Sequence, residues 1–589
     1  MKILLVAVDA KYIHSNLAVQ SLRAYAGKYK DNIEILQFSI NHTEEEILRG
    51  IYMQEADVVS FSCYIWNISI ILDVIDSLKK VQPGVKIWFG GPEVSYNYEE
   101  FITETKNLDG IVVGEGERTF YELVEYYLGI HNDIDNIKGI CYRHSARQEK
   151  AQDNDKENNN DIIFVTPPRD FISLDDIPFA YEDMESHKNK IIYYESSRGC
   201  PYSCSYCLSS AYLVVRFRNM DLVKKELSEF LNHKVPQVKF VDRTFNCNKG
   251  HAMEIWNFIK ENDNGITNFH FEITGDLLSE EELQLLESLR PGLVQLEIGV
   301  QTTNPQTMQA INRRVDFIKL SENVKRIKKA HNIHQHLDLI AGLPLEGFDS
   351  FEKSFNDVYH LRPDQLQLGF LKVLRGAIVE DECKEYGIVY NNKPPYEVLS
   401  TNELTYNEII KLKGICNMVD IYYNSGQFAH SIRYLEHFYN GPMNLYLSLY
   451  NYYVNKGLYT LAHSRMRRFE ILLEFFIKMI NNRDVDNDRA NEIRVFKEIL
   501  LFDSCLREAL KNRPDYVGAP MEHSRFRKIR DELKLSRYKI HIEEFNYDII
   551  ASSELGRPIE KEHIIVFDYS KRDPITNSAS IRILPNDDY

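Results

Sequence analysis

Residues 196–208 read SSRGCPYSCSYCL and contain three of the nine cysteines of the chain. It brings Cys200, Cys204 and Cys207 into one loop at a Cys-x3-Cys-x2-Cys spacing, directly after the strand-like run IIYY. Three thiolates at this spacing can bind three irons of a cubane cluster and leave the fourth iron without a protein ligand. A zinc site would need a fourth Cys or His at suitable spacing, and none stands nearby. The loop therefore predicts an iron–sulfur centre with one open iron.

The chain around this loop alternates strand-like and helix-like segments. Candidate strands cover residues 191–195, 237–241, 268–273, 293–299, 336–341 and 365–371. Helical segments between them cover residues 221–231, 253–260, 280–289, 318–330 and 351–360. Six βα units at this spacing predict a partial (β/α)6 parallel barrel, with its chemistry at the carboxyl ends of the strands. The cysteine loop follows the first of these strands.

A second alternating series precedes the barrel. Its candidate strands are residues 2–8, 33–38, 57–62, 85–89 and 110–113, and its candidate helices are 17–28, 44–52, 68–80 and 119–128. This pattern predicts a doubly wound, flavodoxin-like parallel sheet. The polar and glycine-rich turns AKYIHSN, CYIWN, GGPEVS and GEGE follow four of the strands. Ligands bind beyond the carboxyl ends of such strands, so one edge of this sheet is where a large flat ligand would lie.

The sequence predicts an α/β protein in four parts. A doubly wound domain covers residues 1–140, a linker with a disordered insert at 147–161 covers 141–185, and the barrel covers 186–390. The insert has no apolar periodicity and cannot support a core. Residues 391–589 form a mostly helical domain, with helices at 404–419, 434–454, 461–481 and 491–510 and short strands after about residue 538.

Composition narrows the class of protein. The chain has 589 residues, 44% of them hydrophobic, and a net charge of -17. This charge disfavours a nucleic-acid partner, and the basic stripe within 525–539 is interpreted as a solvated helix face. The start MKILLVAVDA is not a signal peptide, and no apolar run reaches the roughly 20 residues of a membrane span. We therefore expect a cytoplasmic protein, whose nine cysteines serve as thiols and metal ligands.

The cysteine triplet, with Tyr206 before its last member, resembles the signature of the radical S-adenosylmethionine superfamily. VDRTFN, EITGDL, LEIGVQTTN and DLIAGLPLEG resemble the strand ends of that family. The resemblance implies a 4Fe-4S cluster on the three cysteines, S-adenosylmethionine on its open iron, and a flavodoxin- or ferredoxin-type electron donor. It also implies a set of cofactor-binding residues, each of which could instead be a structural group. Tyr206 would lie by the adenine, Asp242 and Arg243 by the methionine amine and carboxylate, Gln301 by the ribose, and the Gly342–Leu343 backbone by the adenine edge.

The doubly wound domain before the barrel resembles the cobalamin-binding branch of the same superfamily, with matches at SCYIWN, GGPEV and GEGE. The resemblance implies cobalamin at the edge formed by Ser62, Tyr64, Trp66, Asn67, Gly90, Gly91, Gly114 and Glu115. The Asp-x-His-x-x-Gly signature is absent, which leaves the lower axial ligand of the cobalt unassigned. His14 is one candidate, and a solvated loop histidine is the alternative interpretation.

This resemblance implies a cobalamin-dependent methyltransferase that acts on an unactivated carbon of an unknown substrate. A radical cyclase, oxidase or rearrangement enzyme on the same scaffold is the first alternative. A non-catalytic cobalamin sensor is the second, and the intact cysteine triplet weighs against it. Methylthiotransferases carry three cysteines in the first domain, where this chain has only Cys63 before residue 140. The carboxyl-terminal third resembles a helical extension of some cobalamin-dependent members, with FDYSKRDPITNSA as a candidate motif.

Overall fold

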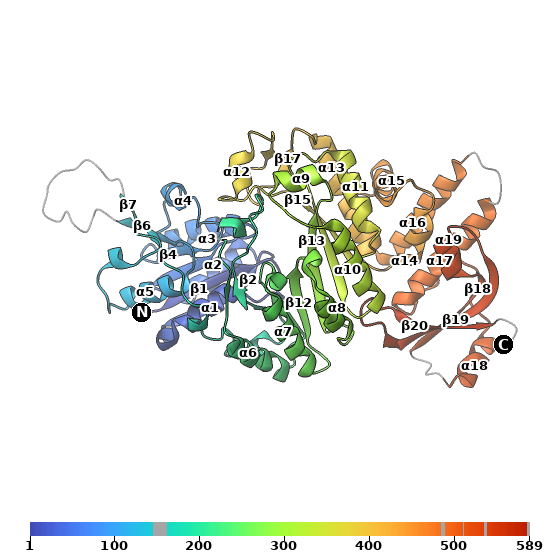
Figure 1. The fold of residues 1–589 in the computed structure, drawn as a ribbon, viewed down its shortest axis with the longest axis horizontal. Helices are drawn as coiled ribbons and strands as arrows, with labels where there is room; N and C mark the ends of the chain where they lie inside the picture. Colours follow the sequence, from blue (N-terminus) through green and yellow to red (C-terminus); the bar gives the residue numbers. More distant parts are fainter. Residues whose placement is uncertain (145–161, 212, 484–488, 511, 535–538, 586–589) are drawn as a thin grey trace. The chain divides into compact units, whose positions relative to one another are not determined.

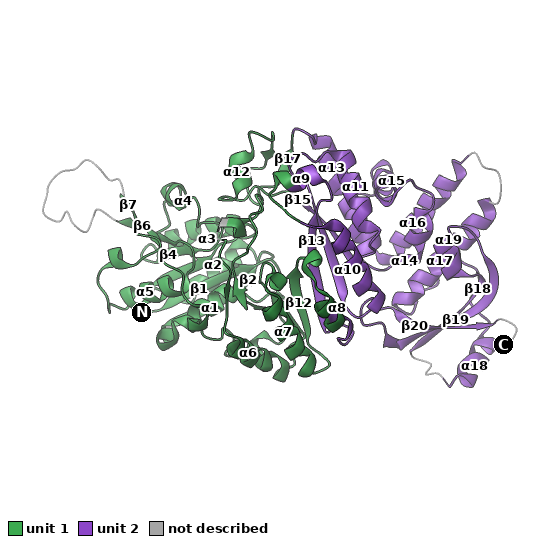
Figure 2. Ribbon diagram, in the orientation of Figure 1, with its two compact units in different colours: residues 1–285, 309–314, 371–401 green, residues 286–308, 315–370, 402–589 purple. Residues whose placement is uncertain are grey.

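A computed structural model describes residues 1–589 apart from 145–161, 212, 484–488, 511, 535–538 and 586–589 (Figure 1). The chain separates into two compact units (Figure 2). Unit 1 comprises residues 1–285, 309–314 and 371–401, and unit 2 comprises residues 286–308, 315–370 and 402–589. The predicted insert at 147–161 lies outside the described residues. The chain leaves unit 1 and returns to it twice, so the barrel series contributes strands to both units.

The amino-terminal part of unit 1 is a seven-stranded sheet in the order β2-β1-β3-β4-β5-β6-β7. The strands are β1 Ile3–Asp9, β2 Ile33–Ser39, β3 Val58–Ser62, β4 Lys86–Gly90, β5 Gly110–Val112, β6 Ile140–His144 and β7 Ile162–Val165. The first five are parallel in the flavodoxin-like order, as predicted. β6 and β7 extend the sheet in antiparallel fashion. Neither β6 nor β7 is among the predicted strands, and β7 is a short edge strand whose four apolar residues are largely exposed.

Helices cover both faces of this sheet. On one face lie α1 Leu17–Tyr25 and α5 Glu117–Tyr127, and on the other lie α2 Glu44–Tyr52, α3 Ile68–Val81 and α4 Tyr98–Glu104. Successive residues of β1 point to opposite faces, so Leu4 and Val6 pack in the second layer while Ile3 and Leu5 pack in the first. Because both faces are buried, the strand is apolar at nearly every position.

The barrel series follows the sequence prediction strand for strand. Unit 1 holds three parallel strands in the order β12-β11-β8, and unit 2 holds three in the order β15-β14-β13. The strands are β8 Ile192–Tyr194, β11 Gln237–Phe240, β12 Asn268–Ile273, β13 Val294–Gln301, β14 His334–Ala341 and β15 Gln365–Phe370. The helices between them are α6 Met220–Asn232, α7 Lys249–Glu261, α8 Glu280–Glu287, α9 Pro305–Ala310, α10 Phe317–Ala330 and α11 Phe348–Tyr359. The predicted α/β class is confirmed.

Segment 371–401 follows the barrel series and belongs to unit 1. It contains the short helix α12 Ile378–Glu382 and the antiparallel pair β16 Val389–Tyr390 and β17 Val398–Ser400. The rest of the chain is helical, as predicted, and ends in an antiparallel sheet β18-β19-β20. Its elements are α13 Tyr406–Val419, α14 Ala429–Glu436, α15 Pro442–Asn455, α16 Arg465–Asn481, α17 Arg489–Arg507, α18 His523–Glu532, β18 Ile540–Tyr547, α19 Ile549–Leu555, β19 Glu560–Arg572 and β20 Ala579–Pro585.

The motif FDYSKRDPITNSA, residues 567–579, forms the end of β19 and the turn into β20. The Asp573 carboxylate accepts hydrogen bonds from the backbone N–H groups of Ile575 and Thr576, which closes the turn. The same side chain pairs with His331 of unit 2 at 2.7 Å. The motif therefore has a structural explanation, as a turn that contacts the segment after α10.

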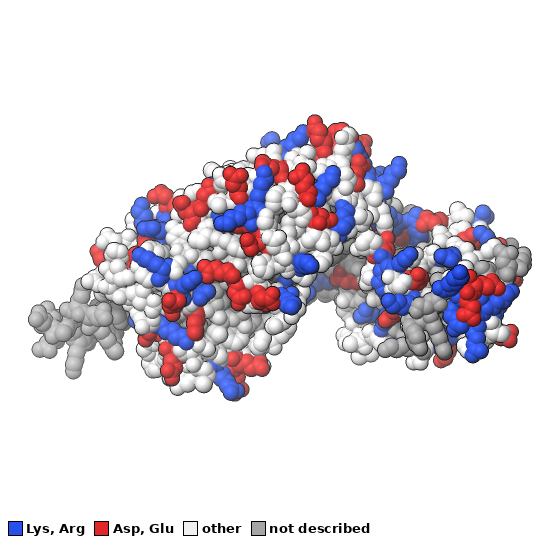
Figure 3. Space-filling view, turned by 90° about the horizontal axis from the view of Figure 1, so that it is seen from below, with Lys and Arg blue, Asp and Glu red and all other residues white. Residues whose placement is uncertain are grey.

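The charge pattern agrees with the interpretation of the basic stripe as a solvated surface. Acidic and basic side chains are interspersed on the face drawn in Figure 3. On α18, Arg525 pairs with Glu544 and Arg530 pairs with Asp531. Residues 535–538 of the stripe lie outside the described residues. Among the described residues, no helix has both the length and the apolar character that crossing a membrane requires.

Candidate functional site

The three predicted cluster ligands lie in one loop after β8, next to the short antiparallel pair β9 Ser197–Arg198 and β10 Arg216–Phe217. Gly199 opens the loop at φ +107°, and a Cβ built there would lie 2.1 Å from the Val214 carbonyl oxygen, so a side chain has no room. Cys200 and Cys204 are buried, Cys207 is half-buried, and all nine cysteines are free thiols. The loop therefore presents three thiols that no disulfide occupies.

A half-buried cation stands beside these thiols. Arg313, from the segment 309–314 that returns to unit 1, places its Nη1 atom 3.8 Å from Cys204 Sγ. Burial raises the pKa of Cys204, and the guanidinium of Arg313 opposes this rise. A cationic neighbour favours the thiolate, the form that binds iron. No sequence pattern singles out Arg313, because it follows a helix rather than a strand and lies about 100 residues from the cysteines.

Two further residues contact or influence the loop and were missed at the sequence level. Thr244 Oγ1 lies 3.5 Å from Cys200 Sγ, in a hydrogen bond whose donor either group can supply. Burial and the neighbouring Cys200 raise the pKa of Cys247 to about 11. Thr244 lies within the segment VDRTFN and Cys247 directly follows it. The resemblance of this segment to a strand end of the family is the sequence signal that could have identified both residues.

Tyr206 lies within the same cluster of side chains. Its phenol oxygen accepts a hydrogen bond from Arg313 Nη1 at 3.3 Å, and burial raises its pKa. Tyr206 and Cys204 therefore share one guanidinium. The structure brings Tyr206 to the cysteines as expected, while its contact with adenine remains a prediction.

Asp242 lies behind the cysteine loop and is fully buried. Its carboxylate accepts hydrogen bonds from the backbone N–H and hydroxyl of Ser196 and from the hydroxyl of Ser197, at 2.6–3.0 Å. Burial raises its pKa to about 6, although these hydrogen bonds oppose the shift. The contacts anchor β9, which leads into the loop. Asp242 thus has a structural role here, and its role toward the methionine amine remains a prediction.

Arg243 lies near the other predicted cofactor edge. Its positive charge acts on Tyr64, whose pKa burial raises to about 12. This interaction connects the end of β11 with the turn after β3, both in unit 1. Its predicted contact with the methionine carboxylate is not tested by any bond in the structure.

The remaining predicted cofactor residues of the barrel belong to unit 2. Gln301 ends β13 at φ +71°, where the pairing of β13 with β14 shifts register. Its Oε1 atom is buried and has no hydrogen-bond partner among the described residues. Gly342 has φ +85° and follows β14, and Leu343 is fully buried. A buried amide oxygen of this kind has the character of a ligand-binding group.

At the edge of the amino-terminal sheet, two of the predicted cobalamin-binding residues, Asn67 and Ser62, form hydrogen bonds within the protein. The Asn67 side chain is fully buried. It donates to the carbonyls of Val8 and Ser62 and accepts from the N–H of Tyr64. The Ser62 hydroxyl accepts a bond from Asn16 at 3.4 Å. Asn67 therefore ties the turn after β3 to the end of β1, and both residues shape the edge.

Other predicted residues leave this edge accessible. The Tyr64 and Trp66 rings stack with centroids 4.3 Å apart, and Trp66 is 43% exposed. Gly91 has φ +116°, and a Cβ there would lie 2.6 Å from the Cys63 carbonyl oxygen. Gly114 has φ +79°, and a Cβ there would meet nothing within 4 Å. Gly90, at the end of β4, pairs with Val112 of β5. The flat aromatic pair and the open backbone at Gly114 are compatible with a large planar ligand, whereas Gly91 packs against Cys63.

Glu115, the last residue predicted at this edge, joins an ion-pair network with the cysteine loop. Arg198 Nη1 lies 3.2 Å from Glu115 Oε2, and Arg198 Nη2 lies 2.8 Å from Glu117 Oε1. Arg216 also pairs with Glu115. Burial alone would raise the pKa of Glu117, but Arg198 outweighs it and holds the pKa below its usual value. The turn after β5 is therefore fastened to the residue two positions before Cys200.

Segment 371–401 contacts the same two regions. The Val379 N–H donates to the Ser205 carbonyl, between Cys204 and Cys207, at 2.9 Å. The Tyr396 hydroxyl donates to the buried carboxylate of Glu93, in the turn after β4. One segment thus bridges the cysteine loop and the predicted cobalamin edge.

His14, the candidate axial ligand, is engaged by the barrel. Its Nδ1 atom shares a hydrogen bond with the Tyr193 hydroxyl, and the two rings stack. Burial lowers the pKa of His14. The imidazole is therefore held by β8, and an axial role would require it to leave this contact.

Comparisons with known proteins agree with this geometry. Residues 3–124 match the B12 binding domain, residues 194–358 match the Radical SAM superfamily, and residues 384–567 match a family described as Protein of unknown function (DUF4080). The chain is 23% identical over 450 residues to 2-(S-pantetheinyl)-carbapenam-3-carboxylate methyltransferase of Streptantibioticus cattleyicolor, covering 72% of this chain and 63% of the relative. It is 24% identical to the cobalamin-dependent radical SAM methyltransferase TokK of Streptomyces tokunonensis, covering 69% and 60%.

A solved structure shows the same fold. The cobalamin-dependent S-adenosylmethionine radical enzyme OxsB, with aqua-cobalamin bound, superposes with a TM-score of 0.57 at 15% identity, covering 85% of this chain and 80% of that one. The protein therefore combines a B12 binding domain with a radical S-adenosylmethionine domain and a helical carboxyl-terminal region. Against the two curated methyltransferases, the match spans about 60% of their length.

The residues present fit the three cofactors that these domains imply. Three free thiols in one loop, with a guanidinium beside Cys204, suit a 4Fe-4S cluster. The buried Oε1 of Gln301 suits a hydroxyl donor such as a ribose. The exposed face of Trp66 and the open space at Gly114 suit the corrin ring of cobalamin.

Proposed function

We propose that the protein is a cobalamin-dependent radical S-adenosylmethionine methyltransferase that methylates an unactivated carbon. One observation carries this proposal: the cysteine loop and the cobalamin edge lie in the same unit and are fastened by Arg198, Glu115 and Glu117. An enzyme that uses a radical source and a methyl donor on one substrate needs both cofactors held at fixed positions. When bound, the cluster and S-adenosylmethionine supply a 5′-deoxyadenosyl radical, and cobalamin supplies a methyl group.

The chain's own residues would hold and orient these groups. Cys200, Cys204 and Cys207 bind iron, and Arg313 offsets the negative charge at Cys204. Asp242 keeps β9 in place through Ser196 and Ser197, which fixes where the loop begins. Each role is one of position and electrostatics, as expected where a cofactor performs the chemistry.

A second set of roles belongs to the predicted cofactor contacts. Gln301 would bind the ribose, and the Gly342–Leu343 backbone would contact the adenine. The stacked pair of Tyr64 and Trp66 would support the corrin. We further propose a flavodoxin- or ferredoxin-type electron donor and a cytoplasmic location. The substrate remains to be identified.

Product analysis tests this proposal without a known substrate. Anaerobic, cluster-loaded and cobalamin-loaded protein is incubated with S-adenosylmethionine and a strong reductant. We expect slow release of 5′-deoxyadenosine, because the radical is quenched in the absence of substrate. Methylation of cobalamin should in addition release S-adenosylhomocysteine. Labelled methyl groups tracked in cell extract would then locate the substrate.

Controls separate the alternatives. A Cys204→Ala variant should release no 5′-deoxyadenosine, and protein without cobalamin should release no S-adenosylhomocysteine. 5′-Deoxyadenosine alone from fully loaded protein would favour a cyclase, oxidase or rearrangement enzyme. Neither product from loaded protein would favour the cobalamin sensor and contradict the proposal.

A further inference from the structure

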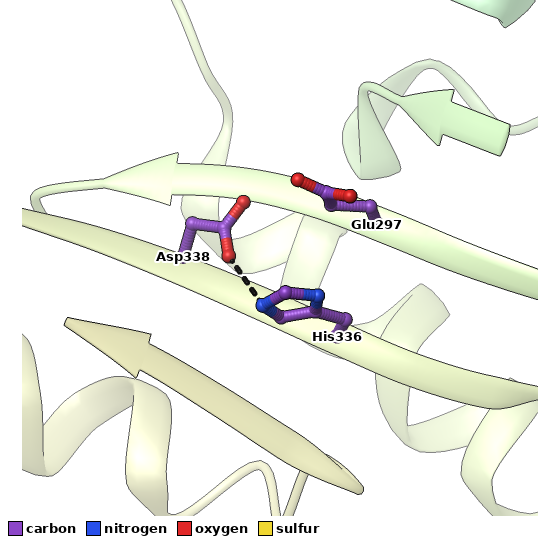
Figure 4. Close-up of side chains that lie close together, drawn as sticks. All are labelled: Glu297, His336 and Asp338. Carbon is purple, nitrogen blue, oxygen red and sulfur yellow. Dashed lines mark ion pairs between the residues drawn. The ribbon is translucent and has the colours of Figure 1, made fainter. Parts of the chain in front are cut away.

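Three side chains on neighbouring strands of unit 2 converge on one another (Figure 4). Glu297 lies in the middle of β13, and His336 and Asp338 lie on β14. The parallel register pairs Glu297 with His336 and Gly299 with Asp338. His336 and Asp338 are two positions apart, so both project from the same face of β14. We name Glu297, His336 and Asp338 the strand cluster.

The strand cluster is compact and withdrawn from solvent. One ligand atom from each residue lies within 4.8 Å of those of the other two. His336 Nε2 lies 2.8 Å from Asp338 Oδ1, and the exposed fractions of the two side chains are 8% and 16%. Ligand atoms around a small divalent cation lie about 3–4 Å apart, given metal–ligand distances of about 2.0–2.2 Å.

The chemistry of the cluster favours a cation. The ligand atoms of the two carboxylates lie within 4.8 Å of each other, which brings like charges together that a bound cation would offset. An imidazole nitrogen and two carboxylate oxygens are ligands that suit Zn²⁺ or Mn²⁺. Gly299 has no side chain and stands opposite Asp338, so the register places no bulk across from that carboxylate.

We propose that Glu297, His336 and Asp338 bind one divalent cation, Zn²⁺ or Mn²⁺, through three protein ligands. Three ligands leave a coordination position open, as in catalytic metal sites. An oxygen or nitrogen atom of a polar substrate would complete the coordination. This inference goes beyond the proposed methyl transfer and does not depend on it, since neither the cysteine loop nor the cobalamin edge supplies a ligand.

Metal titration of the full-length, cluster-loaded protein tests the inference. Mn²⁺ is the first probe because thiols bind it poorly, so the free cysteines do not interfere. After dialysis against a mild chelator, we expect one Mn²⁺ per chain by loss of its free electron paramagnetic resonance signal. Zn²⁺ added to the same sample should displace it. The amount of iron, measured in parallel, should not change.

Variants of the strand cluster give the decisive comparison. His336→Asn and Glu297→Gln should each weaken Mn²⁺ binding by more than about 100-fold, since loss of an outer-shell group alone costs about 10–100-fold. His360→Asn, an exposed histidine of unit 2, is the matched control and should bind as the wild type does. Wild-type protein that binds neither Mn²⁺ nor Zn²⁺ more tightly than the Glu297→Gln/His336→Asn double variant would overturn the proposal.

Folding of the variants is checked by circular dichroism and iron content. Should the variants not fold, the Co²⁺ spectrum of the wild type decides. Weak Co²⁺ absorption bands without a thiolate charge-transfer band would support a site of nitrogen and oxygen ligands. A spectrum without the weak bands would overturn the proposal. Release of 5′-deoxyadenosine and S-adenosylhomocysteine is measured separately. A failed methyltransferase test therefore leaves the metal result standing, and the converse also holds.

Discussion

The cysteine loop and the edge of the amino-terminal sheet both carry residues predicted to bind a cofactor, and they use those residues differently. In the loop, Cys200, Cys204 and Cys207 are free thiols, and the protein surrounds them with supporting groups such as Arg313. At the edge, Asn67 is committed to internal hydrogen bonds. The motif of fixed spacing therefore predicts three side chains that are all free thiols in the structure, whereas the turn motif also contains a residue, Asn67, that shapes the backbone.

The largest effect should come from the loop. Cys204→Ala removes one of three iron ligands, so anaerobically reconstituted protein should fall from about four irons per chain to less than one. Cobalamin binding at the sheet edge should survive. Iron analysis and absorption spectra measure both. Cys416→Ala, which changes a half-buried thiol of unit 2, is the control and should keep its iron. If Cys204→Ala and Cys416→Ala held equal amounts of iron, Cys204 would not be an iron ligand, and the cysteine loop would not differ from the sheet edge in this way.

The next effect tests the link between the regions. Arg198→Met leaves the buried carboxylate of Glu117 without its cation. Breaking such a pair costs about 3–5 kcal/mol of the free energy of unfolding. Urea denaturation followed by circular dichroism measures the loss in unit 1.

Arg118→Met provides the matched control for this link. Arg118 pairs with Glu122 on the surface of α5 and is 46% exposed. Loss of this exposed pair should cost less than about 1 kcal/mol. A similar small loss in both variants would show that the Arg198 network does not hold the loop.

The pH dependence of the free energy of unfolding should reveal the contribution of Asp242, which supports the cysteine loop through Ser196 and Ser197. Asp242 has a pKa of about 6 in the folded protein and an ordinary value of 3.8. The folded state therefore holds this proton more tightly, so the contribution of Asp242 to stability is full below pH 3.8 and is lost as pH rises through 6. The difference corresponds to about 3 kcal/mol.

Asp242→Asn checks this expectation, because asparagine does not titrate. The stability of the wild type relative to this variant should fall by about 2.4 kcal/mol between pH 4 and pH 7, measured by urea denaturation. A constant difference over this range would show that Asp242 is already ionised in the folded state.

The smallest effects compare two neighbours at the sheet edge. Asn67→Ala removes three buried hydrogen bonds and should cost about 2–3 kcal/mol. Trp66→Ala removes an exposed ring with one bond to the Val8 carbonyl and should cost about 1 kcal/mol. Cobalamin retention should drop more in Trp66→Ala, since Asn67 acts through the turn. The reverse order would make Asn67 a direct ligand.

The strands and helices were predictable where burial imposes a regular pattern. β1 is apolar on both faces because helices cover both, and its pattern predicted a buried parallel strand. The edge strand β7 is also apolar, but it has only four residues and is largely exposed, so its run does not indicate burial. The order and spacing of the βα units sufficed to predict the strands of the barrel series, because consecutive strands of this series pair in sequence order.

The candidate site was predictable only in its local part. The cysteine spacing lies within eight residues of one loop. The partners of Glu115 are Arg198 and Arg216, the latter 101 positions away, and Arg313 lies 109 positions from Cys204. Such ion pairs depend on tertiary packing that a single sequence does not display. Glu115 therefore looked like part of a ligand-binding turn, whereas in the structure its carboxylate faces arginines.

Segment 371–401 belongs to unit 1 but is synthesised after most of the barrel series, and this order affects how unit 1 folds. Val379 and Tyr396 complete contacts with Ser205 and Glu93, whose residues leave the ribosome much earlier. Domains generally fold as units during synthesis, amino-terminal first. Unit 1 must wait for most of the barrel to emerge before its last contacts form. The contact of this segment with the cysteine loop can therefore form only after Val379 has been synthesised, and its contact with the sheet edge only after Tyr396.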